Sequence, residues 1–84
     1  MTYITARLVE RPPHGPAYWR VDGMFSFTPR AKAEAWATAC RNDAGHGPRT
    51  IVIDIADDEE AFGLYQSGRM TIREAEILTQ GVAA

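Results

Sequence analysis

The chain has 84 residues, of which 45% are hydrophobic, with two Trp, three Phe and three Tyr; this is enough for one thin core and excludes separate catalytic and binding domains. The single cysteine, Cys40, excludes an internal disulfide and, within one chain, a zinc site of four cysteines or of two cysteines and two histidines. The net charge of −2 is unevenly divided, because residues 1–49 hold seven bases and four acids whereas residues 50–84 hold two bases and seven acids. The two halves therefore attract each other or offer different faces to a partner.

Two strands are predicted at the start of the chain. Residues 2–9 alternate, so that Ile4 and Ala6 point to one side of the strand. Residues 10–17 form a stiff loop with three prolines. Residues 18–27 alternate again, and the pattern continues across Gly23, which predicts one long strand, bent or bulged at the glycine, with Trp19, Val21, Gly23, Phe25 and Phe27 on one face. We expect the two strands to pair in antiparallel fashion.

A helix and a third strand follow. Thr28 and Pro29 are typical of an N-cap and a first helical residue, so the alanine-rich segment 29–44 is predicted to be a helix. Its expected buried stripe is Ala33, Trp36, Ala37, Cys40 and Ala44. Residues 45–48, GHGP, end the helix, and residues 50–56, TIVIDIA, are predicted to form a strand that is central or covered.

Four consecutive acids then precede an apolar helical pattern. Asp57 is expected to cap a helix over residues 57–67, with Glu60 reaching back to the cap in a capping box. Asp58 and Glu59 favour the positive end of the helix dipole. The pattern repeats with Thr71 as cap and Glu74 three residues later. Residues 57–81 are therefore predicted to be a helical hairpin.

These elements define an α+β domain of order ββαβαα. Residues 2–56 form its ββαβ core, with the helix on one face of a three-stranded sheet, and the hairpin 57–81 packs on an edge or on the other face. The second and third strands are expected to run parallel through a right-handed crossover. The first strand is then antiparallel to its partners, at the centre or the edge.

Catalytic and metal sites are not expected. The segment DIADDEEAFGLY lacks the ligand order of a calcium loop, and Asp54 with Asp57 or Asp58 has no accompanying His, Lys or Ser. Cys40 and His46 lack an orienting third group. Residues 45–49, GHGPR, run from a helix into a strand, which is the wrong polarity for a phosphate loop. We expect no enzyme activity and no cofactor.

The sequence is compatible with two alternative binding surfaces. The first is an acidic surface for a basic protein site, made of Asp57, Asp58, Glu59, Glu60, Glu74 and Glu76. The second is a nucleic-acid face on the sheet, made of Tyr3, Arg7, Tyr18, Arg20 and Arg30. This face of the sheet, opposite the one that carries Ile4 and Ala6, is either exposed or covered by the hairpin. A DNA-binding helix-turn-helix over residues 62–80 is disfavoured, because its second helix, TIREAEILTQ, has one Arg against two Glu.

In its size, compactness and acidic C-terminal half, the chain resembles the small inhibitors made by phages and mobile elements, anti-CRISPR proteins among them. That resemblance implies a non-catalytic protein that occludes a nucleic-acid-handling complex of a bacterium. The rival expectation is a small nucleic-acid-binding regulator. We do not expect the start MTYITARLVERPP to be a signal peptide, and no run approaches 18 apolar residues. We expect a cytoplasmic protein that does not contact membranes and that can form a homodimer.

Overall fold

The computed structural model describes residues 1–43 and 49–83 of the chain. Four strands and three helices follow one another as β1 (Thr2–Val9), β2 (Tyr18–Ser26), α1 (Arg30–Asn42), β3 (Thr50–Ile55), α2 (Asp58–Ser67), β4 (Arg69–Thr71) and α3 (Ile72–Ala83). The α+β class is confirmed. The expected count of three strands is wrong, because Arg69–Thr71, between the two C-terminal helices, forms a fourth strand.

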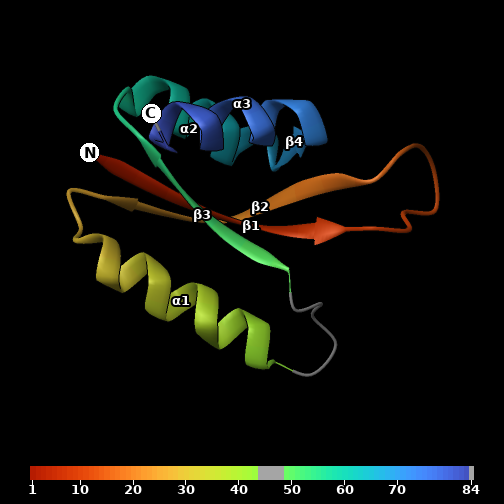
Figure 1. The fold of residues 1–84 in the computed structure, drawn as a ribbon, viewed down its shortest axis with the longest axis horizontal. Coiled ribbons are helices and arrows are strands. Elements are labelled where there is room, and N and C mark those ends of the chain that lie inside the picture. Colours follow the sequence, from red (N-terminus) through yellow and green to blue (C-terminus); the bar gives the residue numbers. More distant parts are fainter. Residues whose placement is uncertain (44–48, 84) are drawn as a thin grey trace.

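The strands form one sheet of order β3-β1-β2-β4 (Figure 1). The central strand β1 is antiparallel to both β2 and β3, and β4 is antiparallel to β2. β2 and β3 therefore run in the same direction, as expected, but β1 lies between them. The predicted hairpin of residues 57–81 is corrected to helix, strand, helix, because β4 ties the chain to the edge of β2 before α3 begins.

Helices cover both faces of the sheet. Figure 1 shows α1 on one face and α2 and α3 on the other. The larger core cluster joins Ile4, Ile53 and Ile55 of the sheet to Ala61 of α2 and Ala75 of α3. The smaller cluster joins Val52 and the ring of Tyr3 to two alanines of α1. The sheet face that carries Tyr3, the predicted nucleic-acid face, is thus partly covered. The element that covers it is α1 and not the C-terminal helices.

A bulge in β2 changes which side chains share a face. Thr5 is opposite Gly23 and Ala6 is opposite Val21, so Asp22 is an extra residue. Val21 and the half-buried Trp19 contribute to the cluster under α2 and α3, whereas Phe25 packs in the cluster under α1. The expected common face for Trp19, Val21 and Phe25 is therefore wrong, because the extra residue reverses the alternation.

The helix α1 starts later than predicted. It runs from Arg30, its N-cap is Pro29, and no side chain caps it. The hydroxyl of Thr28, the predicted cap, donates to the carbonyl of Ser26 instead. Phe27, the predicted last residue of the strand, has left β2 and adopts a positive φ of 55°.

The buried stripe of α1 is narrower than expected. Ala33 and Ala37 are fully buried, but Trp36 is 46% exposed. The Trp36 ring contacts Phe25 of β2 at a centroid distance of 6.3 Å. Cys40 is half-buried. Ala44 and the predicted GHGP connector, residues 45–48, lie outside the described residues.

Both C-terminal helices begin at the predicted caps, but the predicted capping box of α2 is only half formed, because the Glu60 carboxylate does not return a hydrogen bond to the Asp57 N–H. The Asp57 carboxylate accepts from the backbone N–H groups of Glu59 and Glu60. At α3 the Thr71 hydroxyl accepts from the Glu74 N–H at 3.0 Å, and the Glu74 carboxylate accepts from the Thr71 N–H at 3.3 Å, which completes a capping box. Gly68 ends α2 in the left-handed conformation, as expected from its lack of a Cβ. The predicted end of the second helix at Gly81 is wrong, since α3 continues to Ala83.

Side chains form hydrogen bonds with backbone groups of both edge strands, β3 and β4. On β3, Arg41 donates to the carbonyl of Thr50 at 2.9 Å and Arg30 donates to the carbonyl of Val52 at 3.5 Å. On β4, the Ser67 hydroxyl accepts from the N–H of Arg69 and donates to its carbonyl. The Thr71 N–H of β4 is held by Glu74.

Candidate functional site

The acidic run lies at the start of α2, at the end of the sheet where β1 begins. Asp57 is committed to the helix cap, and Asp58 accepts a hydrogen bond from the hydroxyl of Thr2. Glu59 and Glu60 are exposed, and within residues 1–43 and 49–83 their carboxylates have no hydrogen bond or ion pair. The structural reading of the run, a helix start, is confirmed. It leaves the negative charge of the run without a basic partner in the described part of the chain.

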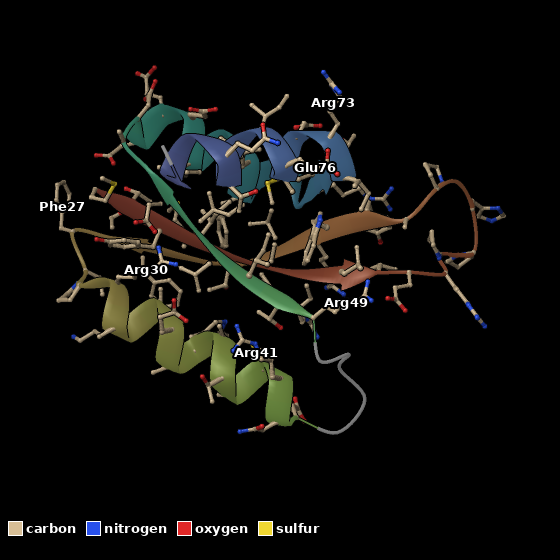
Figure 2. All side chains as sticks on the ribbon, viewed as in Figure 1. Phe27, Arg30, Arg41, Arg49, Arg73 and Glu76 are labelled. Carbon is tan, nitrogen blue, oxygen red and sulfur yellow. The ribbon has the colours of Figure 1, made fainter. Side chains whose placement is uncertain are left out.

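The two acids of α3 are separate from this run. Glu74 belongs to the capping box beside β4. β4 follows the far end of α2, a helix of ten residues, which spans about 15 Å. Glu76 is exposed on α3 (Figure 2). The six predicted acids therefore occupy two regions, and the denser one is Asp57–Glu60.

Large apolar side chains are exposed on the same layer of the molecule. Phe62 and Tyr65 of α2 are 50% and 43% exposed, and Ile77 of α3 is 55% exposed. Next to the acidic run is a cavity of about 420 Å³, lined by Met1, Asp54, Ile55, Ala56, Glu60, Ile77 and Leu78. An acidic edge and an apolar cavity thus adjoin each other at this end of the sheet.

The predicted nucleic-acid face is only partly assembled. Arg7 pairs with Asp22 at 2.6 Å, and Arg30 pairs with Asp54 and Glu34, so these two guanidinium groups already have carboxylate partners. Tyr3 packs against the α1 cluster. Tyr18 and Arg20 remain available on β2.

β4 adds a residue to this face that the sequence analysis did not include. Arg69 lies directly across from Arg20, and its guanidinium carbon stands 4.3 Å from the centre of the Tyr18 ring. Neither arginine pairs with a carboxylate in the part of the chain that the structure describes. Two like charges on facing positions repel each other, and a bound anion would relieve that repulsion.

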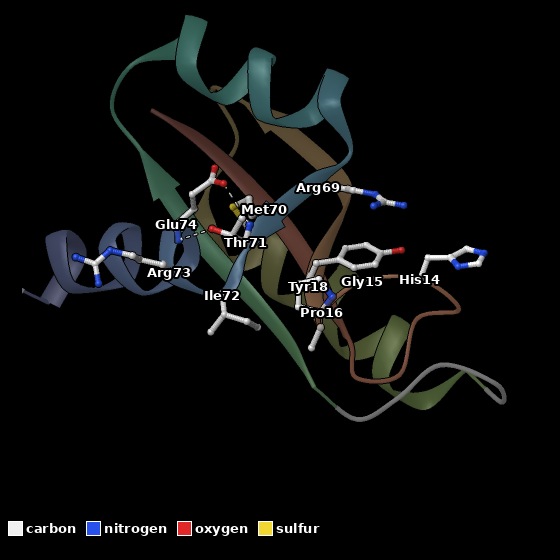
Figure 3. Close-up of a pocket in the computed structure, with 11 residues that line it drawn as sticks. His14, Gly15, Pro16, Tyr18, Arg69, Met70, Thr71, Ile72, Arg73 and Glu74 are labelled. Atoms are coloured by element: carbon white, nitrogen blue, oxygen red, sulfur yellow. Dashed lines mark hydrogen bonds between the residues drawn. The ribbon is translucent and has the colours of Figure 1, made fainter.

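A second cavity opens beside this pair (Figure 3). It measures about 460 Å³ and lies between the proline loop and the first turn of α3. Its lining includes Tyr18, Met70 and Ile72, with Arg69 and Arg73 as cationic members and Glu74 as an acidic one. A flat or apolar group with a negative charge fits this lining chemically.

Cys40 is placed where it is a weak nucleophile. It lines a shallow cavity with Arg7, Asp22 and Trp36. Partial burial raises the pKa of its thiol above the usual value, and the nearby Asp22 carboxylate raises it further, against a smaller lowering by Arg7. His46, its suggested partner, lies outside the described residues. In residues 1–43 and 49–83, no three His, Cys, Asp or Glu side chains are grouped closely enough to hold a metal ion.

Two functional candidates were missed by sequence reasoning. Arg69 falls within the predicted helical hairpin and is given no role there, although Arg69-Met70-Thr71 does alternate polar, apolar, polar. Phe27 was assigned to the apolar face of a strand, but it is 85% exposed. The Thr-Pro sequence directly after Phe27 was a signal that the strand ends there.

Comparison with protein families, with curated proteins and with solved structures finds no match for this chain. Among the helices of the described residues, none combines the length and the apolar character needed to cross a membrane.

Proposed function

We propose that this protein is a non-catalytic protein-binding module that inhibits a partner by occluding a basic surface. The observation that carries the proposal is the unpaired acidic run at the start of α2, next to exposed apolar side chains. Opposite charge guides such a surface to a basic groove, and aromatic and aliphatic side chains supply contact area once it is there. The basic groove of a bacterial nucleic-acid-handling complex, as in the anti-CRISPR class, is the partner we expect.

The charge of the run is available for binding because folding does not neutralise it. The Thr2 hydroxyl that holds Asp58 is uncharged, and the groups that Asp57 caps are backbone amides. Arg30, a basic side chain of the opposite layer, is paired with Asp54 and Glu34. The helix start therefore carries a net negative potential that a cationic partner can use.

The test is a charge reversal with a matched control. Glu59→Lys/Glu60→Lys alters two exposed side chains without removing a helix cap, and Glu10→Lys/Glu34→Lys makes the same change in net charge elsewhere. We expect the wild-type and control proteins to retain the same bacterial proteins in a quantitative pull-down, and the Glu59/Glu60 variant to lose them. Identical profiles for all three proteins would reject the acidic surface.

The second candidate function is a small nucleic-acid-binding regulator, favoured by one observation. Arg20 and Arg69 face each other beside the Tyr18 ring, and neither has a carboxylate partner among the described residues. Labelled single-stranded DNA or RNA tests it, because phosphate contacts make binding weaken with salt. Arg20→Ala/Arg69→Ala should reduce the salt slope by about two if both arginines contact phosphates. Absence of binding at low salt rejects this candidate.

A further inference from the structure

The turn after β2 presents an exposed aromatic ring on strained backbone. Phe27 is 85% exposed and has a φ of 55°, a region that costs a non-glycine residue about 1–3 kcal/mol. Its N–H donates to the carbonyl of Met1 at 3.2 Å, which places the turn beside the start of β1. Figure 2 shows Phe27 at this extreme end of the molecule. Since the ring buries almost no area, the core does not account for a phenylalanine there.

The apolar cavity of about 420 Å³ begins next to this turn. Met1 belongs to its lining, and its apolar walls come from Ile55 and Ala56 after β3 and from Ile77 and Leu78 of α3. Ile77 is 55% exposed, so the cavity is open to an incoming side chain. A cavity of this size accepts one large apolar group.

The polar edge of the cavity is acidic. Glu60 is part of its lining, and Asp58 and Glu59 belong to the same helical turn. Asp54, which also lines it, is paired with Arg30. An apolar cavity with an unneutralised acidic edge is complementary to a group that is apolar at its tip and basic beside it.

We propose that Phe27 and this cavity dock a basic segment of a partner protein through one large apolar side chain. The anchor enters between Ile55 and Ile77, Phe27 packs on its flank, and Lys or Arg residues beside it meet Glu59 and Glu60. This inference rests on the proposed protein-binding function and defines the partner segment chemically. A second copy of this chain fits less well, since a two-fold contact here brings two acidic helix starts together.

The test uses the full chain and three synthetic helical peptides of twelve residues. The first is rich in Lys and Ala with one central Phe; the second has Ser in place of that Phe; the third has Glu in place of the Lys residues. With isotope-labelled protein, the first peptide should shift the amide signals of Ala56, Glu60 and Ile77, and the other two should leave them in place.

Variants of exposed residues then measure the contribution of each wall. Phe27→Ser and Ile77→Ser should each weaken binding of the first peptide about tenfold, the effect of losing one anchoring contact. Trp36→Ser is the matched control, because Trp36 is 46% exposed on α1, which lies on the other face of the sheet (Figure 1), and it does not line the cavity. It should bind like the wild-type protein.

Three outcomes would overturn the inference. They are equal binding of the Ser peptide, shifts confined to the region of Tyr18 and Arg69, and concentration-dependent shifts of the cavity amides without peptide, which would mean that a second copy fills it. If the Glu59/Glu60 variant loses the pull-down partners while Phe27→Ser and Ile77→Ser keep them, the proposed function stands and this inference fails. If all three variants keep them, the proposed function fails as well.

Discussion

Gly23 and Gly63 show how differently the same residue type can be constrained. A Cβ at Gly23 would stand 2.5 Å from the Thr5 hydroxyl oxygen and 3.2 Å from the Trp36 indole nitrogen. Thr5 is fully buried and bonded to Asp22, so it has little room to move. A Cβ at Gly63, in the middle of α2, would meet nothing within 4 Å. One glycine allows a close approach, and the other weakens a helix.

Alanine at these two positions should therefore have opposite effects on stability. We expect Gly23→Ala to lower the free energy of unfolding by about 1–3 kcal/mol through overpacking. Gly63→Ala should raise it by about 0.5–1 kcal/mol, since alanine restricts the unfolded chain and favours helix. Urea unfolding followed by circular dichroism measures both. A loss of stability in Gly63→Ala would mean that the outer face of α2 is packed against something.

At the scale of the elements, the two edge strands are protected by side chains. Unpaired carbonyl and N–H groups along an edge invite pairing with another chain. Here the guanidinium groups of α1 occupy carbonyls of β3, and Ser67 and Glu74 occupy groups of β4. The helix α1 thus covers a sheet face and also blocks the edge of β3.

Removing one of these blocks should make the protein associate. Arg41→Ala frees the Thr50 carbonyl while changing an exposed helix position, at a cost of about 1 kcal/mol in stability. We expect this variant to self-associate at a lower protein concentration than the wild-type protein in sedimentation velocity. Arg73→Ala, which removes an exposed arginine of α3 that donates no hydrogen bond to β3, is the control and should match the wild-type protein.

The sequence predicted the elements that have strong local signals. Alternation revealed β1, β2 and β3, alanine content revealed α1, and the pairs Asp57/Glu60 and Thr71/Glu74 located the starts of α2 and α3. β4 was missed because three residues are too few for a pattern and because its pairing with β2 is a tertiary event. A bulge in β2 was anticipated, but its effect, which is to place Phe25 on the opposite face from Trp19 and Val21, was not. The apolar residues of β2 fit either face, so the residue types did not reveal it.

The candidate sites were less predictable than the elements. The helix-start role of the acidic run followed from spacing, but the ion pairs Arg7–Asp22 and Arg30–Asp54 join chain segments that lie 15 and 24 residues apart. Likewise, the exposure of Phe27 results from where the sheet ends. Surface availability is therefore decided by packing, which residue types alone do not reveal.

At the scale of the whole molecule, few large apolar side chains are fully buried among the described residues. The largest buried side chains are Ile4, Ile53 and Met70, together with Thr2 and Thr5. Met70 is the inward residue of β4, opposite Trp19 of β2, and it is 1% exposed. It fixes the segment between α2 and α3 to the sheet. A chain of 84 residues has a total stability of about 4–13 kcal/mol, so one such contact matters.

Met70→Ala should consequently affect the entire C-terminal layer. We expect a loss of about 2–5 kcal/mol in the free energy of unfolding, from lost apolar contact and the cavity left behind. Met70→Leu keeps the volume and should cost less than about 1.5 kcal/mol. Urea titration gives both values. Equal, small effects for the two variants would indicate that β4 is dispensable for the fold.

The extra residue at Asp22 also determines where the chain tolerates a change of length. Trp19 and Val21 precede it and serve the layer of α2 and α3, whereas Phe25 follows it and serves the layer of α1. Deleting Asp22 would still leave Val21 opposite Ala6 and Gly23 opposite Thr5, so both segments of β2 would keep their layers. Deleting a residue on either side of it would turn one segment over, and one layer would lose its aromatic or branched contact. The proline loop before β2 has no such alternation to preserve, so we expect an inserted residue there to leave both layers intact.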